Sequence, residues 1–169
     1  MMRLDKAFFQ RDVLVVAPEL LGKILVRRME SGELLRFRIC EVEAYRGQED
    51  KACHASKGRT QRTKVMFQEG GFVYVYLIYG MYWLLNFVTG REGEAQAVLI
   101  RGVEGINGPG RLGKILNLDN TFYGEDLMDS NRLWVEGDDR KFKYTSSPRI
   151  GITTAGEYWK NRPWRFVLS

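Results

Sequence analysis

Hydrophobic and polar positions alternate along much of this chain, and such a two-residue period predicts β-strands. Residues 23–28 and 34–45 show this pattern, and Ser31-Gly32 between them supplies the turn of a hairpin. The strongest β signal is the aromatic and β-branched run 72–79, which a two-residue turn separates from the run 82–89. We therefore expect two antiparallel hairpins.

Helical signals are few and short. Apolar residues near the N-terminus indicate helical turns that end before Pro18, and a break at 107–110 precedes a helix over 111–118. A further β run covers 95–103, and the C-terminal part alternates turns with short strands. Strand runs outnumber helices without regular β-α-β alternation, which predicts the α+β class with a mostly antiparallel sheet. Because no repeat or linker divides the sequence, we expect a single domain over 1–169.

The composition fits one globular domain with its own core. The chain has 169 residues, of which 44% are hydrophobic and 28% charged, and a domain of this size buries about 68–70% of its unfolded surface. Cys40 and Cys53 are too few for a disulfide scaffold. Because His54 is the only histidine, the sequence lacks the paired ligands of a zinc ribbon or zinc finger. The sequence lacks a signal-peptide pattern and an apolar run of the ~20 residues that span a bilayer. We expect a cytoplasmic protein without membrane contact.

Charge is distributed unevenly. The formal net charge is +5, yet the segment 51–64 alone carries five basic residues and no acidic one, Arg59, Arg62 and Lys64 among them. Segment 119–139 has seven acidic residues against one basic residue. A basic run is either a solvated face or a polyanion-binding surface, and this basic loop and the basic C-terminal tail can form one electropositive surface.

Two carboxylates stand side by side in the second predicted strand. Glu41 and Glu43 alternate with other residues, so both project to one face of the strand, and Tyr45 follows on that face. If the face is partly buried, repulsion and desolvation raise the pKa of at least one carboxylate, which makes a general base; on a solvated face both pair with arginines. Arg101, in an apolar run, needs a carboxylate or phosphate partner, and Glu43 is a candidate.

Aromatic side chains crowd the hairpin 72–89. Tyr74 and Tyr76 share one face, whereas Tyr79 directly precedes the turn glycine and is placed to protrude from the tip, where a ring can wedge between stacked bases. Core and cross-strand packing is the alternative, above all for Tyr74. Asn86 lies among apolar residues, where a buried amide must be hydrogen-bonded, either within the sheet or to a ligand.

Other motifs carry less chemistry. The cysteines, the histidine and Glu43 match no paired-ligand spacing, so we expect no metal site. Residues 108–113 formally read GxGxxG, but without β-α-β repeats and with a proline in the turn they are better explained as a turn that opens a helix. Arg111 at the start of that helix is a candidate phosphate contact.

An ordered set of motifs runs through nearly the whole chain. It comprises Glu41-Val42-Glu43-Ala44-Tyr45, Glu49-Asp50-Lys51-Ala52-Cys53-His54, Met66-Phe67, Tyr74-Val75-Tyr76-Leu77-Ile78-Tyr79-Gly80-Met81-Tyr82, Asn86, Val98-Leu99-Ile100-Arg101, Gly108-Pro109-Gly110, Pro148-Arg149-Ile150-Gly151-Ile152 and Pro163-Trp164-Arg165-Phe166. In its order and spacing, this set resembles the alkyladenine (N-methylpurine) DNA glycosylase family.

The resemblance implies a compact α+β domain with a curved antiparallel sheet, peripheral helices and a protruding hairpin. It also implies a monomeric hydrolase of base excision repair that binds duplex DNA containing a damaged purine. Such an enzyme is cytoplasmic and associated with DNA, in the nucleoid or the nucleus depending on the organism. The enzyme would flip an alkylated or deaminated purine out of the duplex and hydrolyse its N-glycosidic bond without a metal or other cofactor, leaving an abasic site.

The resemblance also assigns roles to individual residues. It implies that Glu43 is the general base that activates water, assisted by Arg101; that Tyr45, His54, Tyr76 and Asn86 form the base-binding pocket; and that Tyr79 intercalates into the DNA stack. On the DNA backbone we expect Arg59, Arg62, Lys64 and Arg111. An alkylated purine is cationic, and each aromatic face adds about 0.5–2 kcal/mol of cation–π attraction.

Some features limit these expectations. The resemblance gives no lysine of the matched motifs the role of an amine nucleophile, so we expect no lyase step. The chain ends soon after 163–166, earlier than the family pattern, so we expect a shortened pocket wall or backbone contact. A non-catalytic nucleic-acid-binding module is the leading alternative, and a dinucleotide-dependent oxidoreductase at the glycine-rich turn is the second. The sequence does not rank the lesions, whose fit depends on pocket shape.

Overall fold

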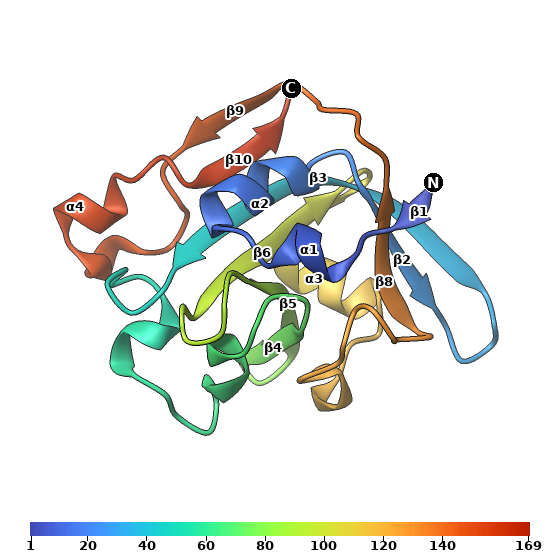
Figure 1. The fold of residues 1–169 in the computed structure, drawn as a ribbon, viewed down its shortest axis with the longest axis horizontal. Helices are drawn as coiled ribbons and strands as arrows, with labels where there is room; N and C mark the ends of the chain where they lie inside the picture. The colour runs from blue at the N-terminus through green and yellow to red at the C-terminus, as the bar shows by residue number, and fades with distance from the viewer.

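Ten strands form the framework of the protein in a computed structural model that describes residues 1–169. They pair in the order β1-β8-β2-β3-β6-β5-β4, with β7 beside β6 and with β10 paired to both β3 and β9 (Figure 1). Every pairing is antiparallel. The strands are β1 (Met2–Arg3), β2 (Ile24–Arg28), β3 (Leu34–Arg46), β4 (Val73–Ile78), β5 (Tyr82–Thr89), β6 (Gln96–Val103), β7 (Ile106–Asn107), β8 (Leu133–Gly137), β9 (Tyr144–Ser147) and β10 (Arg165–Leu168). The predicted α+β class with an antiparallel sheet is confirmed.

Short helices complete the fold. They are α1 (Lys6–Phe9), α2 (Val13–Leu20), α3 (Pro109–Ile115) and α4 (Glu157–Lys160), with 3-10 turns η1 (His54–Lys57), η2 (Lys64–Phe67), η3 (Asn120–Phe122) and η4 (Thr153–Ala155). Figure 1 shows α1 and α2 in front of β3 and β6. Asp5 and Asp12 cap α1 and α2, because their carboxylates accept hydrogen bonds from free backbone N–H groups of the first turn.

Three predicted helix boundaries are wrong: α3 ends at Ile115 and not at 118, and the other two errors lie at prolines. Helix α2 does not end before Pro18 but continues to Leu20; a proline this close to the helix end removes one backbone bond, and the burial of Leu20 on the sheet offsets that loss. Helix α3 begins at Pro109, two residues before the predicted start. Proline suits the first helical position because its missing N–H has no partner there.

The two faces of the sheet differ in chemistry. On the helix-bearing face, Val42 and Ala44 of β3 join Ile100 of β6 and the buried residues of α1, α2 and α3 in the main hydrophobic core. Because side chains alternate across a strand, Glu43 and Arg101 belong to the opposite face. The loop between β3 and β4 packs there through a second hydrophobic cluster, which contains Cys53, Ala55, Val65, Met66, Phe67, Tyr74, Val88, Ala95 and Ala97.

Both predicted hairpins are confirmed, in β2–β3 and β4–β5. At the β4–β5 tip, Tyr79 and Gly80 have φ angles of 51° and 65°, both positive as in the central residues of a type I′ turn. The connection has three residues instead of the predicted two, because β4 ends at Ile78 and Ile78 pairs with Tyr82. The N–H of Met81 closes the turn on the carbonyl of Ile78 at 3.0 Å. The side chain of Tyr79 is 86% exposed, so it does protrude from the tip.

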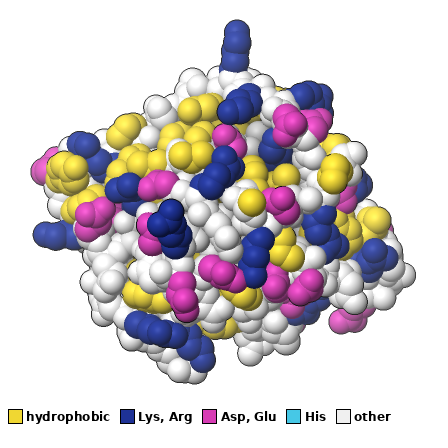
Figure 2. Space-filling view, viewed as in Figure 1, with side chains coloured by type: hydrophobic (Ala, Val, Ile, Leu, Met, Phe, Trp, Pro, Cys, Tyr) yellow, Lys and Arg dark blue, Asp and Glu magenta, His cyan; other side chains and the backbone are white.

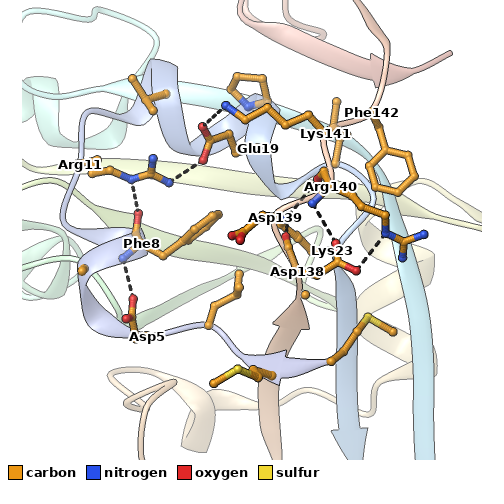
Figure 3. Close-up of a pocket in the computed structure, with 18 of the residues that line it drawn as sticks. Asp5, Phe8, Arg11, Glu19, Lys23, Asp138, Asp139, Arg140, Lys141 and Phe142 are labelled. Atoms are coloured by element: carbon orange, nitrogen blue, oxygen red, sulfur yellow. Dashed lines mark hydrogen bonds and ion pairs between the residues drawn. The ribbon is translucent and has the colours of Figure 1, made fainter.

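The helix-bearing face has mixed charge. Figure 2 shows Lys and Arg interspersed with Asp and Glu on this side. A hollow of about 900 Å³ lies there between α1, α2 and the loop 137–142. Several of its ionic groups are bound within the protein: Glu19 accepts hydrogen bonds from Arg11 and Lys141, and Lys23 donates to backbone carbonyls of the loop (Figure 3). No helix is long and apolar enough to cross a membrane.

Candidate active site

Glu43 carries a fully buried carboxylate in the candidate site, with a side chain that is 0% exposed. Its Oε1 accepts a hydrogen bond from the hydroxyl of Tyr45 at 2.7 Å, and its Oε2 accepts one from the backbone N–H of Ile150 at 2.7 Å. Burial raises the pKa of Glu43, while the nearby Arg101 guanidinium and these two donors act in the opposite direction. A raised pKa makes this carboxylate a stronger base than a solvated glutamate, as a group that accepts a proton from water requires.

The predicted pair of Arg101 with Glu43 is present but long. Arg101 Nη1 lies 3.8 Å from Glu43 Oε1, whereas its Nε lies 3.3 Å from Oε2 of Glu41. The same oxygen of Glu41 accepts a hydrogen bond from Nε of Arg165 at 2.7 Å. Strand β10 pairs with β3 and places Arg165 opposite Glu43. Glu41 therefore lies between two arginines and holds Arg101 beside, rather than on, the Glu43 carboxylate.

Aromatic rings from two strands and the β3–β4 loop surround the same region. The rings of His54 and Tyr76 have centroids 4.6 Å apart, and those of Tyr74 and Tyr76 are 5.5 Å apart. Nδ1 of His54 is 2.8 Å from the hydroxyl of Tyr74. Burial, helped by Arg62 and Lys57, lowers the pKa of His54 to about 4, so the imidazole is neutral at pH 7.

Asn86 lies on β5, paired with Tyr74 of β4. It is only 3% exposed, and its Nδ2 donates to the backbone carbonyl of Tyr74 at 3.1 Å. The sequence left two hydrogen-bond partners open for this amide, one within the sheet and one on a ligand. In the structure, the amide is hydrogen-bonded within the sheet.

The predicted DNA-contact residues are all exposed, but they are not equivalent. Arg59 and Lys64 carry free cationic groups on the β3–β4 loop, whereas Arg62 stacks over Tyr76 with 5.1 Å from Cζ to the ring centroid. This loop and residues 151–155 line a hollow of about 380 Å³, which joins part of the basic loop to the C-terminal segment. Arg111 follows Gly110, whose Cα packs against the ring of Tyr82 near the hairpin.

Sequence reasoning gave no role to two further residues, Asp50 and Arg149. Both side chains are 0% exposed and form an ion pair of 2.6 Å between Nη1 and Oδ2. Arg149 Cζ also lies 4.8 Å from the ring centroid of Tyr45. Both residues stand within the quoted motifs, but neither has a local hydrophobic pattern that would reveal its burial. The structure contains no group of three or more His, Cys, Asp or Glu residues arranged to hold a metal ion.

Comparison with known proteins identifies the class. A family model described as methylpurine-DNA glycosylase matches residues 7–107 and 104–169. Relatives named "Putative 3-methyladenine DNA glycosylase" are 46% identical in Legionella pneumophila strain Corby, 43% in Rickettsia felis and 44% in Methanocella arvoryzae. The alignments cover 99%, 98% and 96% of this chain and 95%, 93% and 90% of the respective relatives.

These matches define the chain as a DNA glycosylase, a hydrolase that acts on N-glycosyl bonds. More narrowly, it belongs to the methylpurine-DNA glycosylase family. The resemblance found in the sequence motifs is confirmed.

Proposed function

We propose that this protein flips an alkylated or deaminated purine out of duplex DNA and hydrolyses its N-glycosidic bond with water activated by Glu43. One domain over residues 1–169 carries the activity and acts as a monomer on DNA in base excision repair. The observation that carries the proposal is the fully buried carboxylate of Glu43, fixed by two hydrogen bonds of 2.7 Å beside a cluster of aromatic rings.

The reaction needs little beyond a base and a positioned water. Glu43 accepts a proton from the water as its oxygen forms a bond to C1′, and the C1′–N bond breaks with its electrons moving to the purine. An alkylated purine is cationic, so it leaves as a neutral base. A neutral purine such as hypoxanthine also needs a proton on its ring, which Glu43 in its ionised form does not supply.

The rings of Tyr45, His54 and Tyr76 hold the flipped base by stacking. The low pKa of His54, about 4, helps here because a neutral imidazole does not repel a cationic purine as an imidazolium would. Arg101, held by Glu41 at 3.3 Å, orients the water or the carboxylate. Asn86 forms the pocket wall that contacts the edge of the base.

The exposed residues act on the DNA itself. Tyr79, at the tip of the β4–β5 hairpin and 86% exposed, fills the space that the flipped nucleotide leaves in the stack. Arg59, Arg62, Lys64 and Arg111 contact backbone phosphates. No lysine amine lies among the proposed catalytic groups, so the product is an intact abasic site without strand cleavage.

The test compares wild type with Glu43→Gln on a duplex containing one hypoxanthine and on methylated duplex DNA. We expect base release by wild type and none by Glu43→Gln, which keeps its affinity for the lesion. Glu136→Gln on β8, where Glu136 pairs with Arg36, is the matched control and keeps full activity. Binding by wild type without release of any base would overturn the proposal in favour of a non-catalytic binding module.

A further inference from the structure

We propose that Arg149, locked by Asp50, is a positioning residue that holds both hydrogen-bond donors on Glu43. This inference rests on the proposed function, in which Glu43 is the general base. Arg149 itself makes no hydrogen bond to Glu43. It acts through its sequence neighbour Ile150 and through the ring of Tyr45.

The guanidinium of Arg149 is fixed from several sides. Its Nη1 and Nη2 meet Oδ2 and Oδ1 of Asp50 at 2.6 and 3.0 Å, and they also donate to the carbonyls of Ala44 at 3.0 Å and Trp159 at 3.3 Å. Asp50 in turn accepts backbone N–H groups from Arg46 and Ala52. A planar bidentate pair of this kind sets orientation as well as distance.

Both donors on Glu43 depend on this group. Ile150 directly follows Arg149 in the chain, so fixing Arg149 fixes the N–H that reaches Oε2 of Glu43 at 2.7 Å. The guanidinium lies between the rings of Tyr45 and Trp164, 4.8 and 5.0 Å from their centroids. The position of the Tyr45 ring determines where its hydroxyl meets Oε1 of Glu43 at 2.7 Å.

Stability alone does not explain the arrangement. A buried ion pair pays a large desolvation cost, and well-packed apolar residues of similar volume often serve a fold as well or better. In addition, Nε of Arg149 is buried without a hydrogen-bond partner, which is a further cost. The pair instead joins the C-terminal segment to β3 at the carbonyl of Ala44, the residue between Glu43 and Tyr45.

A pH profile reports this role because the base must be ionised. The groups that face Glu43 are Tyr45 on its own strand, Tyr76 from β4, Arg101 from β6, and Arg149 with the Ile150 N–H from the C-terminal segment. Arg165 from β10 is bound to Glu41 instead. If Arg149 no longer holds the donors, the carboxylate loses stabilisation and its pKa rises. The rate then falls at a higher pH than in wild type.

The experiment measures single-turnover release of methylpurine from methylated duplex DNA between pH 4.5 and 9. Arg149→Lys keeps the positive charge but cannot form the bidentate pair. We expect its acid limb to move up by about one pH unit and its plateau rate to fall by up to about 100-fold, as for a catalytic group displaced by an ångström. Asp50→Asn leaves Arg149 in place without its partner and should shift the limb in the same direction.

Leu20→Ala, in the core on the other face of the sheet, is the control for lost stability. It should lower the melting temperature without moving the acid limb. If Arg149→Lys does not fold, Asp50→Asn carries the test. Acid limbs that coincide with wild type in the folded variants would overturn the inference while Glu43→Gln remains inactive. Failure of wild type to release any base would instead overturn the proposed function.

Discussion

The hydroxyl of Tyr45 donates a 2.7 Å hydrogen bond to Oε1 of Glu43, two residues earlier on the same strand. The period of a strand makes this contact possible, because residues i and i+2 project to one face. In the proposed function, this side chain therefore has two roles: its ring stacks on the flipped base, and its hydroxyl stabilises the carboxylate. Burial of Glu43 raises its pKa, and this hydrogen bond opposes that effect.

The variant Tyr45→Phe distinguishes the role of the ring from the role of the hydroxyl. The variant keeps the aromatic face and loses only the hydroxyl, so the pKa of Glu43 should rise and the acid limb of the single-turnover rate should move to higher pH. Affinity for a lesion-containing duplex should stay within about threefold of wild type, because the stacking face is retained. Fluorescence anisotropy and a pH–rate profile on the same duplex check both parts. An unchanged acid limb would contradict the role of the hydroxyl.

His54 should make the protein less stable in mild acid. Burial lowers its pKa in the folded state to about 4, whereas an unfolded histidine titrates near about 6.5. Between these values the unfolded chain binds a proton that the folded chain does not, so stability falls as the pH falls from 7 toward 4. Lowering the pH from 7 to 5 should cost about 2 kcal/mol from this group.

Urea unfolding of wild type and His54→Gln at several pH values measures that contribution. The variant lacks the titrating group, so its stability should depend less on pH in this range, and the difference between the two proteins should grow toward pH 5. Parallel curves would show that His54 is not the group responsible.

Much of the fold follows from local sequence patterns, and the rest depends on contacts that such patterns do not report. Alternation, together with runs of aromatic and β-branched residues, predicts β2 through β6. The family motifs contain Glu43, Tyr45, His54 and Tyr76, and the resemblance predicts that these four residues gather in one region. Local patterns do not predict the helix boundaries at the prolines, since the burial of Leu20 decides how far α2 extends.

Long-range ion pairs account for what the sequence left open in the site. Asp50 and Arg149 are 99 residues apart, and Glu41 and Arg165 are 124 residues apart. Which carboxylate meets which arginine depends on the pairing of β10 with β3, and residue spacing holds no record of that pairing. The sequence names Glu43 as a candidate partner of Arg101, but it does not show that Glu41 is the nearer partner.

Replacing Tyr79 should make the protein more stable and less active on duplex DNA. It occupies the left-handed region with φ of 51°, which costs a bulky residue about 1–2 kcal/mol. Tyr79→Asn introduces the Asn-Gly pair that type I′ turns favour, so urea unfolding should show a gain of about 0.5–1 kcal/mol. Base release from duplex DNA should fall because no ring enters the stack, while release from single-stranded DNA should change little. A variant with wild-type activity on the duplex would refute the wedge role.

Salt dependence should locate the DNA-binding face. Phosphate contacts release counterions, so the logarithm of the affinity should fall linearly with the logarithm of the salt concentration. Arg59 is exposed on the basic β3–β4 loop and makes no ion pair within the protein, so Arg59→Gln should reduce the slope by about one. Lys141→Gln is the matched control: Lys141 pairs with Glu19 on the helix-bearing face, and its loss should leave the slope unchanged. A larger effect from Lys141→Gln than from Arg59→Gln would place the DNA on the helix-bearing face, away from Glu43.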